Sequence, residues 1–326
     1  MVTTSLVRDA KLTYGDDIEI DFNTNFPQVY ENNPYLTKLD SKDKSVEQIE
    51  LCYKAGIPLS AKEKLHFTTY FHRDFELKTG LHVDPLFSQT DLHLSDFERE
   101  NPPITGRYWV VFGGGKKDRT VKHWEYTRYQ QVVNVLREYG LRFVQSGAAK
   151  KDHTHPPMTN VLNLVGWGGI RQLIWQIAHC EGVICPITCA MHVASAFNKP
   201  CVVIAGGIEE PWWEAYVNNY KAFGPKAQPI SVEHKYLHTL GLLDCCARKG
   251  CWKMKVIKDD ENKPLCKLPM LSDSGQPVAE CMDMISVDHV VEAVLSYYKD
   301  GTLPPIGQPK ESDPYLIRNQ IQLPRL

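Results

Sequence analysis

The stretch that decides the fold lies at residues 107–115 and reads Arg-Tyr-Trp-Val-Val-Phe-Gly-Gly-Gly. A short apolar run that ends in glycines is typical of a buried strand that leads into a turn. Apolar residues then recur at helical spacing, at Tyr129, Val132, Val133 and Leu136, and Gly140 ends this helix before a strand at 141–144. The alternation continues, with strands predicted at 161–165, 182–185 and 201–205 and helices at 170–177 and 190–197. This spacing predicts an α/β fold with a parallel, doubly wound sheet.

The N-terminal part of the chain has a less regular pattern. Residues 5–14 are predicted to be helical, residues 18–22 to form a strand and residues 46–55 to form a second helix, which together indicate a smaller α/β domain. Asn101-Pro102-Pro103 and Gly106 suit a linker between two domains. We therefore expect an N-terminal α/β domain at 1–103, a C-terminal α/β domain at 104–300 and a proline-rich, unfolded tail at 301–326.

The composition narrows the class of protein. With 326 residues, the chain exceeds what one hydrophobic core usually organises, so two domains with a cleft between them are expected. It contains neither an apolar run of roughly 20 residues nor a secretory signal, which favours a cytoplasmic protein without a membrane span. A net charge of −2 does not indicate nucleic-acid binding, and ten cysteines without a signal peptide favour thiols or metal ligands over disulfides. A homo-oligomer is compatible with all of these features.

The glycine turn at 113–122 is the first candidate binding segment. It reads Gly-Gly-Gly-Lys-Lys-Asp-Arg-Thr-Val-Lys and joins a predicted strand to a predicted helix. Bare backbone at a helix start, together with lysines, can hold a diphosphate, and the candidate residues are Gly114, Gly115, Lys116 and Lys122. A solvated basic turn is the alternative interpretation. A P-loop is excluded, because Gly-x-x-x-x-Gly-Lys-[Ser/Thr] does not occur.

Two further segments follow predicted strands. Thr188 can cap the helix after the strand at 182–185, and the free amides beyond it would face the crevice in which open α/β sheets bind ligands. A plain helix cap with His192 packed in the core is the alternative. After the strand at 201–205, carboxylates and tryptophans could contact sugar hydroxyls and a base, unless they merely begin a helix and fill the core. The candidates in the two segments are Thr188, Cys189, Met191, His192, Glu209 and Glu210.

These segments carry a family resemblance. Lys122-His123-Trp124 resembles the Lys-x-Trp segment of the family 9 glycosyltransferases, the heptosyltransferase group. Residues 191–197, Met-His-Val-Ala-Ser-Ala-Phe, are similar to that family's Met-His-x-Ala-x-Ala helix, and residues 207–213 occupy the place of its Gly-x-x-x-Pro turn. The resemblance implies a GT-B fold of two Rossmann-like domains. It also implies ADP-heptose or a related nucleotide sugar as donor, with Lys122 on the diphosphate and the turn at 188–192 lining its pocket.

The chain departs from this family pattern in two places. Ile187-Thr188-Cys189 stands where the family usually carries Asp-Ser-Gly, so the acidic contact made there is absent and the sugar is expected to differ. Met1-Val2-Thr3-Thr4 resembles the residues just after the family's first strand and its Gly-x-Gly-Asp turn. By this resemblance the N-terminal domain lacks its first strand, and the reading frame and the catalytic base are expected upstream of Met1. The fallback bases within the chain are Asp9, Glu209 and Glu210.

Five of the ten cysteines crowd into residues 245–281. Four converging thiolates can hold zinc or iron in a closed, structural site. The predicted ligands are Cys246, Cys251, Cys266 and Cys281, with Cys245 as the alternative. Some family 9-like heptosyltransferases that modify bacterial surface proteins carry a cysteine-bound iron, and this cluster resembles theirs. Unconnected, reduced thiols are the other interpretation.

The function predicted from these segments is transfer of a sugar, heptose or related, from a nucleotide-diphosphate donor to the hydroxyl of a glycan, protein or other polymer. No metal would take part in the chemistry. Lys122 and helix-start amides would stabilise the departing diphosphate while a base deprotonates the acceptor. A non-catalytic nucleotide-sugar-binding or assembly protein of the same fold is the alternative. An epimerase or dehydrogenase is disfavoured, because no Gly-x-Gly-x-x-Gly follows the strand at 107–112.

Overall fold

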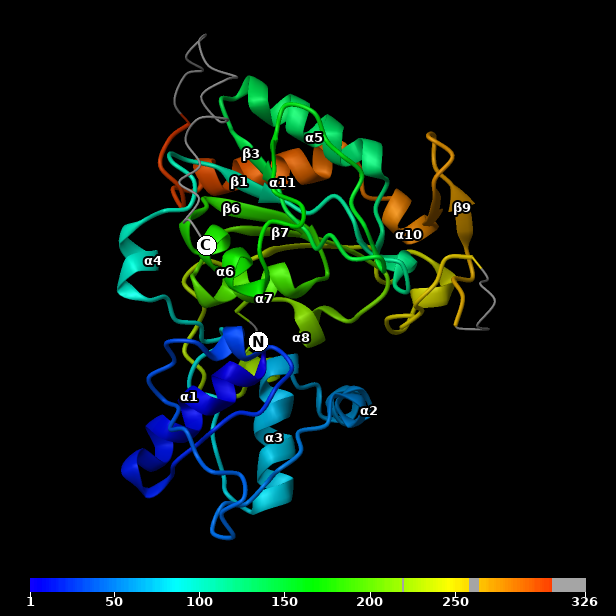
Figure 1. The fold of residues 1–326 in the computed structure, drawn as a ribbon. Helices are drawn as coiled ribbons and strands as arrows, with labels where there is room; N and C mark the ends of the chain where they lie inside the picture. Colours follow the sequence, from blue (N-terminus) through cyan, green and yellow to red (C-terminus); the bar gives the residue numbers. More distant parts are fainter. Residues whose placement is uncertain (219, 258–263, 307–326) are drawn as a thin grey trace.

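The computed structural model describes residues 1–218, 220–257 and 264–306, so most of the predicted tail lies outside the described residues. Figure 1 shows two lobes, an upper one built on a parallel sheet and a lower one formed by N-terminal helices. No helix within the described ranges combines the length and the apolar character needed to cross a membrane.

Six parallel strands organise the upper lobe. Their spatial order is β5 (Leu162–Asn163), β3 (Phe143–Gln145), β1 (Trp109–Val111), β6 (Gly182–Pro186), β7 (Cys201–Gly206) and β8 (Lys235–His238). In register, Val110 pairs with Val144 on one side and with Val183 on the other. The chain builds β3 and β5 outward from β1 and then returns to build β6, β7 and β8 on the other side. The order therefore reverses between β1 and β6, which is the topological switch point of a doubly wound sheet.

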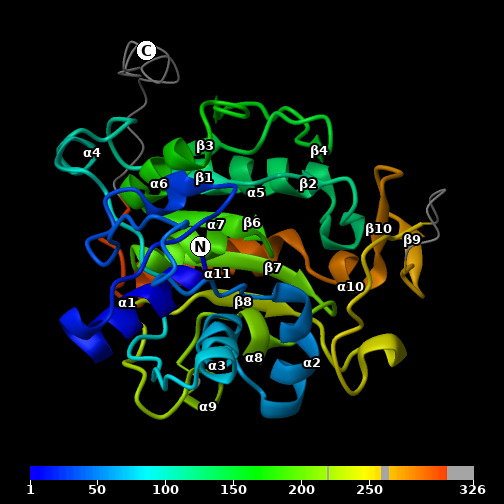
Figure 2. The same cartoon turned by 60° about the horizontal axis from the view of Figure 1, so that its bottom comes forward.

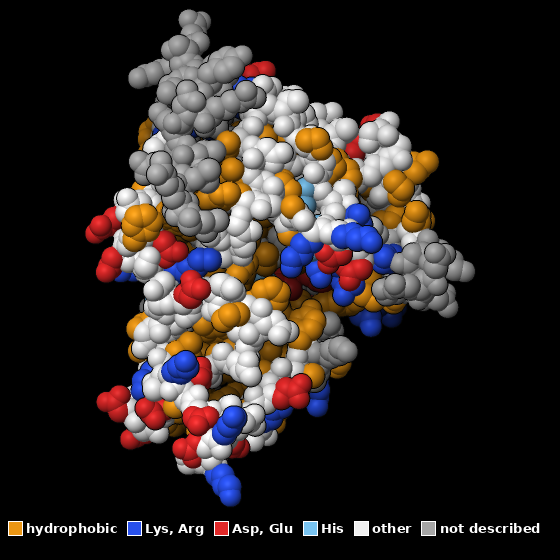
Figure 3. Space-filling model, in the orientation of Figure 1, with side chains coloured by type: hydrophobic (Ala, Val, Ile, Leu, Met, Phe, Trp, Pro, Cys, Tyr) orange, Lys and Arg blue, Asp and Glu red, His pale blue; other side chains and the backbone are white. Residues whose placement is uncertain are grey.

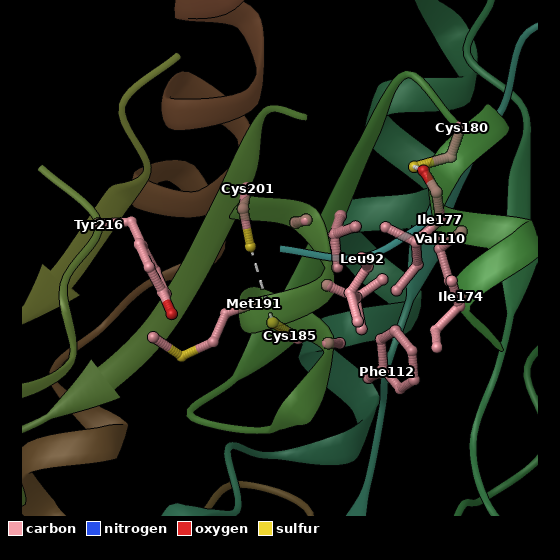
Figure 4. Packing of buried hydrophobic residues seen from close by; sticks show 14 of the residues in the cluster. Leu92, Val110, Phe112, Ile174, Ile177, Cys180, Cys185, Met191, Cys201 and Tyr216 are labelled. Carbon is pink, nitrogen blue, oxygen red and sulfur yellow. Dashed lines mark hydrogen bonds between the residues drawn. The ribbon is translucent and has the colours of Figure 1, made fainter. Parts of the chain in front are cut away.

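Helices cover both faces of this sheet, as Figure 1 shows. The face with α6 (Ile170–His179) and α7 (Cys189–Ala196) buries Val110 and Val183, whereas the face with α5 (Tyr126–Glu138) and α11 (Val287–Lys299) buries Trp109. Because successive strand residues point to opposite faces, the central strands are apolar throughout, as parallel strands usually are. Figure 4 shows part of the first face, where Cys185 and Cys201 from neighbouring strands bring their sulfur atoms to 3.8 Å. The predicted α/β fold is confirmed, and β8 is a strand that the sequence analysis missed.

The remaining elements are short. They are β2 (Gly115–Lys116), β4 (His153–Thr154), β9 (Pro269–Leu271), β10 (Pro277–Ala279), α4 (Asp96–Glu100), α8 (Pro211–Glu214), α9 (Tyr220–Phe223) and α10 (Glu280–Asp283), with 3-10 turns at Gly15–Asp17, Pro27–Tyr30, Thr120–Lys122 and Asp244–Cys246. The antiparallel pairs β2–β4 and β9–β10 lie outside the main sheet.

The lower lobe differs from the predicted second α/β domain. It consists of α1 (Thr3–Tyr14), α2 (Tyr53–Glu63) and α3 (Phe67–Thr79), and residues 1–108, all of them described, form no strand beyond a single bridge at Phe87. The predicted strand at 18–22 runs extended with alternating burial, but no neighbouring strand pairs with it. The predicted helix at 46–55 is wrong, because the chain is irregular until α2 begins at Tyr53. Period-two alternation defines two faces, whereas a strand also needs a hydrogen-bonding partner.

The two lobes are packed together rather than loosely linked. Trp213 of the upper lobe is fully buried in the same cluster as Leu6 and Phe71 of the lower lobe. The hydroxyl of Thr90 donates to the carbonyl of His192 at 2.6 Å, across the two lobes. This contact brings the lower lobe against α7, at the carboxyl end of β6.

Candidate active site

The three candidate segments follow three adjacent strands, β1, β6 and β7. Parallel strands end at the same edge of a sheet, so the glycine turn, the start of α7 and the Gly207–Glu210 segment meet at the switch point. Figure 2 shows α2, α3 and α8 together below the sheet in that view, and Figure 3 shows a hollow between the lobes with lysine and arginine side chains along its upper edge. The sequence therefore identified segments that the fold brings together.

The glycine turn is shaped by close contact with β4. A Cβ atom on Gly114 would lie 2.0 Å from the carbonyl oxygen of Thr154, so only glycine fits there. Gly115 lies beside the ring of His123, and Lys116 is exposed. Burial lowers the pKa of both His123 and His155 to about 4, so neutral imidazoles line the turn at neutral pH. The positive charge at this turn therefore comes from its lysines and arginine.

Lys122 links two of the segments. Its Nζ atom lies 2.7 Å from Oε1 of Glu209, and the two side chains are only 20% and 9% exposed. The other oxygen of Glu209 has no hydrogen-bond partner among the described residues. A half-buried lysine whose counter-ion can turn away is suited to an incoming phosphate.

Glu210 does not pair with Lys122. It instead contacts residues 245–281, which contain five cysteines and are called the cysteine segment below. Its Oε1 accepts from the backbone amide of Gly250 at 2.7 Å. The backbone amides of Cys251 and Trp252 also donate to the carbonyls of Gly207 and Ile208, at 3.2 and 2.9 Å, so three hydrogen bonds tie the cysteine segment to the residues after β7.

The start of α7 has unused hydrogen-bonding groups. Thr188 is its N-cap residue by position, but its hydroxyl makes no capping hydrogen bond and is buried without a partner among the residues described. Cys189, the first residue of the helix, is exposed. Met191 instead points into the core, where Figure 4 shows it among Cys185, Cys201 and Tyr216. Free amides and a free hydroxyl at a helix start favour an anion there.

His192 belongs to a buried polar network. Its Nδ1 lies 2.8 Å from the hydroxyl of Tyr216, and its Nε2 lies 3.6 Å from Oε2 of Glu214. Burial lowers the pKa of His192 well below its usual range, so the ring is neutral at neutral pH. His192 is therefore buried, as the helix-cap alternative expects, and its ring faces polar side chains; a role in binding stays a prediction.

Glu214 is a site residue that the sequence analysis missed. It ends α8 and is only 4% exposed, and its Oε2 has no hydrogen-bond partner within the described ranges. Burial raises the pKa of this carboxyl well above its usual range, and so does the neighbouring Glu209, while Lys122 opposes the rise. The available signal was a carboxylate between Trp212-Trp213 and Ala215-Tyr216, since the large apolar side chains on either side of it are of the kind usually buried.

Asp9, the other fallback base, is held within the lower lobe. Its side chain is fully buried and accepts hydrogen bonds from Nε of Arg8 at 2.8 Å and from the amide of Leu86 at 3.2 Å. It also lies 2.9 Å from Nε2 of His72. These three contacts occupy both carboxylate oxygens.

The predicted metal ligands lie around one pocket. Cys245, Cys251, Cys266 and Cys281 line a cavity of about 220 Å³, whereas Cys246 is buried behind it against Gly207. Four thiols suit a soft metal, but the described side chains form no group of three or more potential ligands arranged to hold an ion. Burial raises the pKa of the thiols, to about 12 for Cys281, so they stay protonated when no metal is bound.

A family model and a curated relative both point to the same group of proteins. Residues 58–240 match the sequence model described as Glycosyltransferase family 9 (heptosyltransferase). Lipooligosaccharide heptosyltransferase 2 of Haemophilus influenzae is 25% identical over 139 residues, which are 40% of this chain and 40% of that protein.

One solved structure extends the likeness to the fold, and a second is reported beside it. A family 9 glycosyltransferase from Veillonella parvula superposes over 90% of this chain and 92% of its own, with a TM-score of 0.55 and 13% identity. The iron-containing dodecameric glycosyltransferase TibC from enterotoxigenic E. coli covers 71% of this chain and 53% of its own, with a TM-score of 0.46 and 17% identity. With the family match spanning more than half of its residues, the chain belongs to glycosyltransferase family 9, the heptosyltransferase family.

Proposed function

We propose that this protein transfers a sugar, heptose or a related one, from a nucleotide-diphosphate donor to an acceptor hydroxyl. The observation that carries the proposal is a half-buried Lys122 at the same edge of the sheet as the start of α7. Lys122 pairs with Glu209 there, and the hydroxyl of Thr188 at the start of α7 has no partner among the described residues. Family membership supports the reaction class. An ADP-sugar is the favoured donor, in keeping with the resemblance drawn from the sequence.

The proposed chemistry follows from the charges at this site. The acceptor oxygen forms a bond to the sugar carbon while the bond from that carbon to the diphosphate breaks, and the diphosphate leaves with an added negative charge. Lys122, the amides of α7 and the hydroxyl of Thr188 would stabilise that charge. Among the fallback bases, Glu209 is favoured by its position beside Lys122, since the carboxylates of Asp9 and Glu210 already accept other hydrogen bonds.

The first experiment is a titration with ADP. Lys122→Ala should weaken ADP binding by about 10- to 150-fold, because a charge-assisted contact contributes about 1.5 to 3 kcal/mol. Lys78→Ala is the matched control. It also removes a lysine that pairs with a carboxylate, Asp74 at 2.8 Å, but this lysine lies in α3 of the lower lobe. Equal ADP affinity in wild type and Lys122→Ala would contradict the assignment.

Turnover separates a transferase from a binding protein of the same fold. Purified protein is incubated with a panel of nucleotide sugars and candidate glycan and protein acceptors, and mass spectrometry follows sugar addition and release of the nucleoside diphosphate. Transfer that is lost in Lys122→Ala supports the proposal. Tight nucleotide-sugar binding without transfer to any acceptor would favour the non-catalytic alternative.

We further propose that the cysteine pocket holds one structural zinc or iron ion. Because Cys245 lines the cavity and Cys246 does not, the ligand set that the pocket favours is Cys245, Cys251, Cys266 and Cys281. Four thiolates leave no open position, so the ion would stabilise the segment tied to the end of β7 without taking part in transfer. Metal analysis after mild dialysis tests this: Cys245→Ser should lose the ion and Cys246→Ser should keep it. Folded wild-type protein without bound metal would contradict the proposal.

A further inference from the structure

Glu214 is a carboxyl group that the fold buries and leaves incompletely paired. Its side chain is 5% exposed, and Oε2 has no hydrogen-bond partner among the described residues. An unsatisfied buried carboxyl group costs stability, and an apolar residue of similar size would avoid that cost. Such a group is expected where a ligand supplies the missing partner.

The neighbours of Glu214 place a neutral imidazole beside its carboxyl group. The hydroxyl of Tyr216 lies 2.8 Å from Nδ1 of His192, and burial raises the pKa of this hydroxyl well above its usual range, so it keeps its proton and can donate to Nδ1. The proton of the neutral imidazole then sits on Nε2, which lies 3.6 Å from Oε2 of Glu214. At this distance the N–H faces the carboxyl group without satisfying it.

The position of Glu214 is related to the proposed diphosphate contact. Lys122 and Glu209 are the charges that act most strongly on its carboxyl group, with opposite effects. The preceding residue, Trp213, packs against Phe67 of α3 with ring centroids 4.7 Å apart and the rings tilted by 31°. Glu214 therefore lies near the proposed diphosphate contact and next to a residue that packs against the lower lobe.

A sugar carried by the terminal phosphate must extend away from the diphosphate, toward the lobe from which an acceptor would enter. We propose that Glu214 hydrogen-bonds a hydroxyl group of the transferred sugar and thereby selects it, an inference that rests on the proposed function. A carboxyl group can accept a hydrogen bond from a hydroxyl when ionised and can also donate one when protonated. A buried site built for a hydroxyl rejects a ligand that lacks it, because its own polar group is then left unpaired.

The experiment compares ADP with ADP-heptose, so that the sugar contribution is measured separately from the nucleotide. Glu214→Gln keeps the shape of the side chain, and Glu214→Met removes the hydrogen-bonding group while avoiding a buried unpaired one. Both variants should bind ADP within about two-fold of wild type, and Glu214→Met should bind ADP-heptose about ten-fold or more weakly than wild type. Glu181→Gln, at the opposite end of β6 beside Arg107, is the control and should change neither affinity.

Deoxy analogues of the sugar identify the hydroxyl. Wild type should lose affinity for one analogue that lacks a single hydroxyl, whereas Glu214→Met should bind that analogue and the parent equally. Unchanged ADP-heptose affinity in Glu214→Met with normal ADP binding would overturn this inference alone, as would a wild type that binds ADP-heptose no more tightly than ADP. A wild type that binds neither ligand would overturn the proposed function itself.

Discussion

Acid should destabilise this protein through its buried histidines, and His66 allows a quantitative test. His66 is fully buried where the lobes meet, with its ring 4.1 Å from that of Phe223 and its amide donating to the carbonyl of Ala222. Burial lowers its pKa from the usual 6.5 to about 3. Between these two values the unfolded chain binds one more proton than the native protein, so stability falls as pH decreases below about 6.5.

The size of the effect follows from the two pKa values. From pH 7.0 to about pH 5.5, the proton that only the unfolded chain binds at this site removes about 1.2 kcal/mol of unfolding free energy. His66→Asn should abolish that share, and it retains a side-chain oxygen to cap α3 through the amide of Thr68. Any packing loss in the variant is the same at both pH values and cancels in the comparison.

Urea unfolding at the two pH values provides the measurement. Between pH 7.0 and about pH 5.5, the unfolding free energy of wild type should fall by about 1.2 kcal/mol more than that of His66→Asn. His82→Asn is the control, because Glu76 raises the pKa of this exposed histidine and its removal should increase acid sensitivity. Equal losses in wild type and His66→Asn would mean that native His66 takes up a proton near pH 5.5, which would refute the argument from burial.

Three other substitutions test the framework around the site. Tyr297→Phe removes a hydroxyl that bonds the backbone of β7 and β8, and should lower the unfolding free energy by about 1 to 3 kcal/mol in urea titrations. Gly114→Ala places a Cβ 2.0 Å from the carbonyl oxygen of Thr154, so the turn must move; a lower melting temperature and weaker ADP binding are expected, and unchanged values would contradict the close approach. Asp9→Asn leaves the buried Arg8 without its main counter-ion and should cost about 3 to 5 kcal/mol in unfolding experiments. If Asp9→Asn instead abolishes transfer with stability intact, Asp9 acts as a base.

The amino-acid sequence determined the upper lobe to a large extent. The apolar run at 107–112, the glycines after it and the helical spacing of Tyr129, Val132, Val133 and Leu136 are local signals, and all four helix residues are buried on α5. Because helices and strands alternate, the parallel arrangement follows from chain connectivity, and the carboxyl ends of its strands must share one edge. The glycine turn and the segments after β6 and β7 could therefore be chosen as one site before any contact was known.

Only the tertiary structure decided which groups meet at that site. Lys122 pairs with Glu209 and not with Glu210, Met191 turns into the core, and Cys245 rather than Cys246 lines the cysteine pocket. Each of these differences separates residues that are neighbours in the chain or on one short helix. A local pattern reports backbone periodicity, whereas the direction of a side chain depends on partners far away in the sequence.

The lower lobe shows the same limit most clearly. Residues 18–22 alternate in burial as the sequence predicts, yet they form no strand because no second strand lies beside them. Glu214 belongs to a four-residue helix, and its unusual electrostatics arise from Glu209, Lys122 and the lobe packed over it. Periodicity is encoded residue by residue, whereas pairing and burial are properties of the assembled chain, so only the folded structure could supply them.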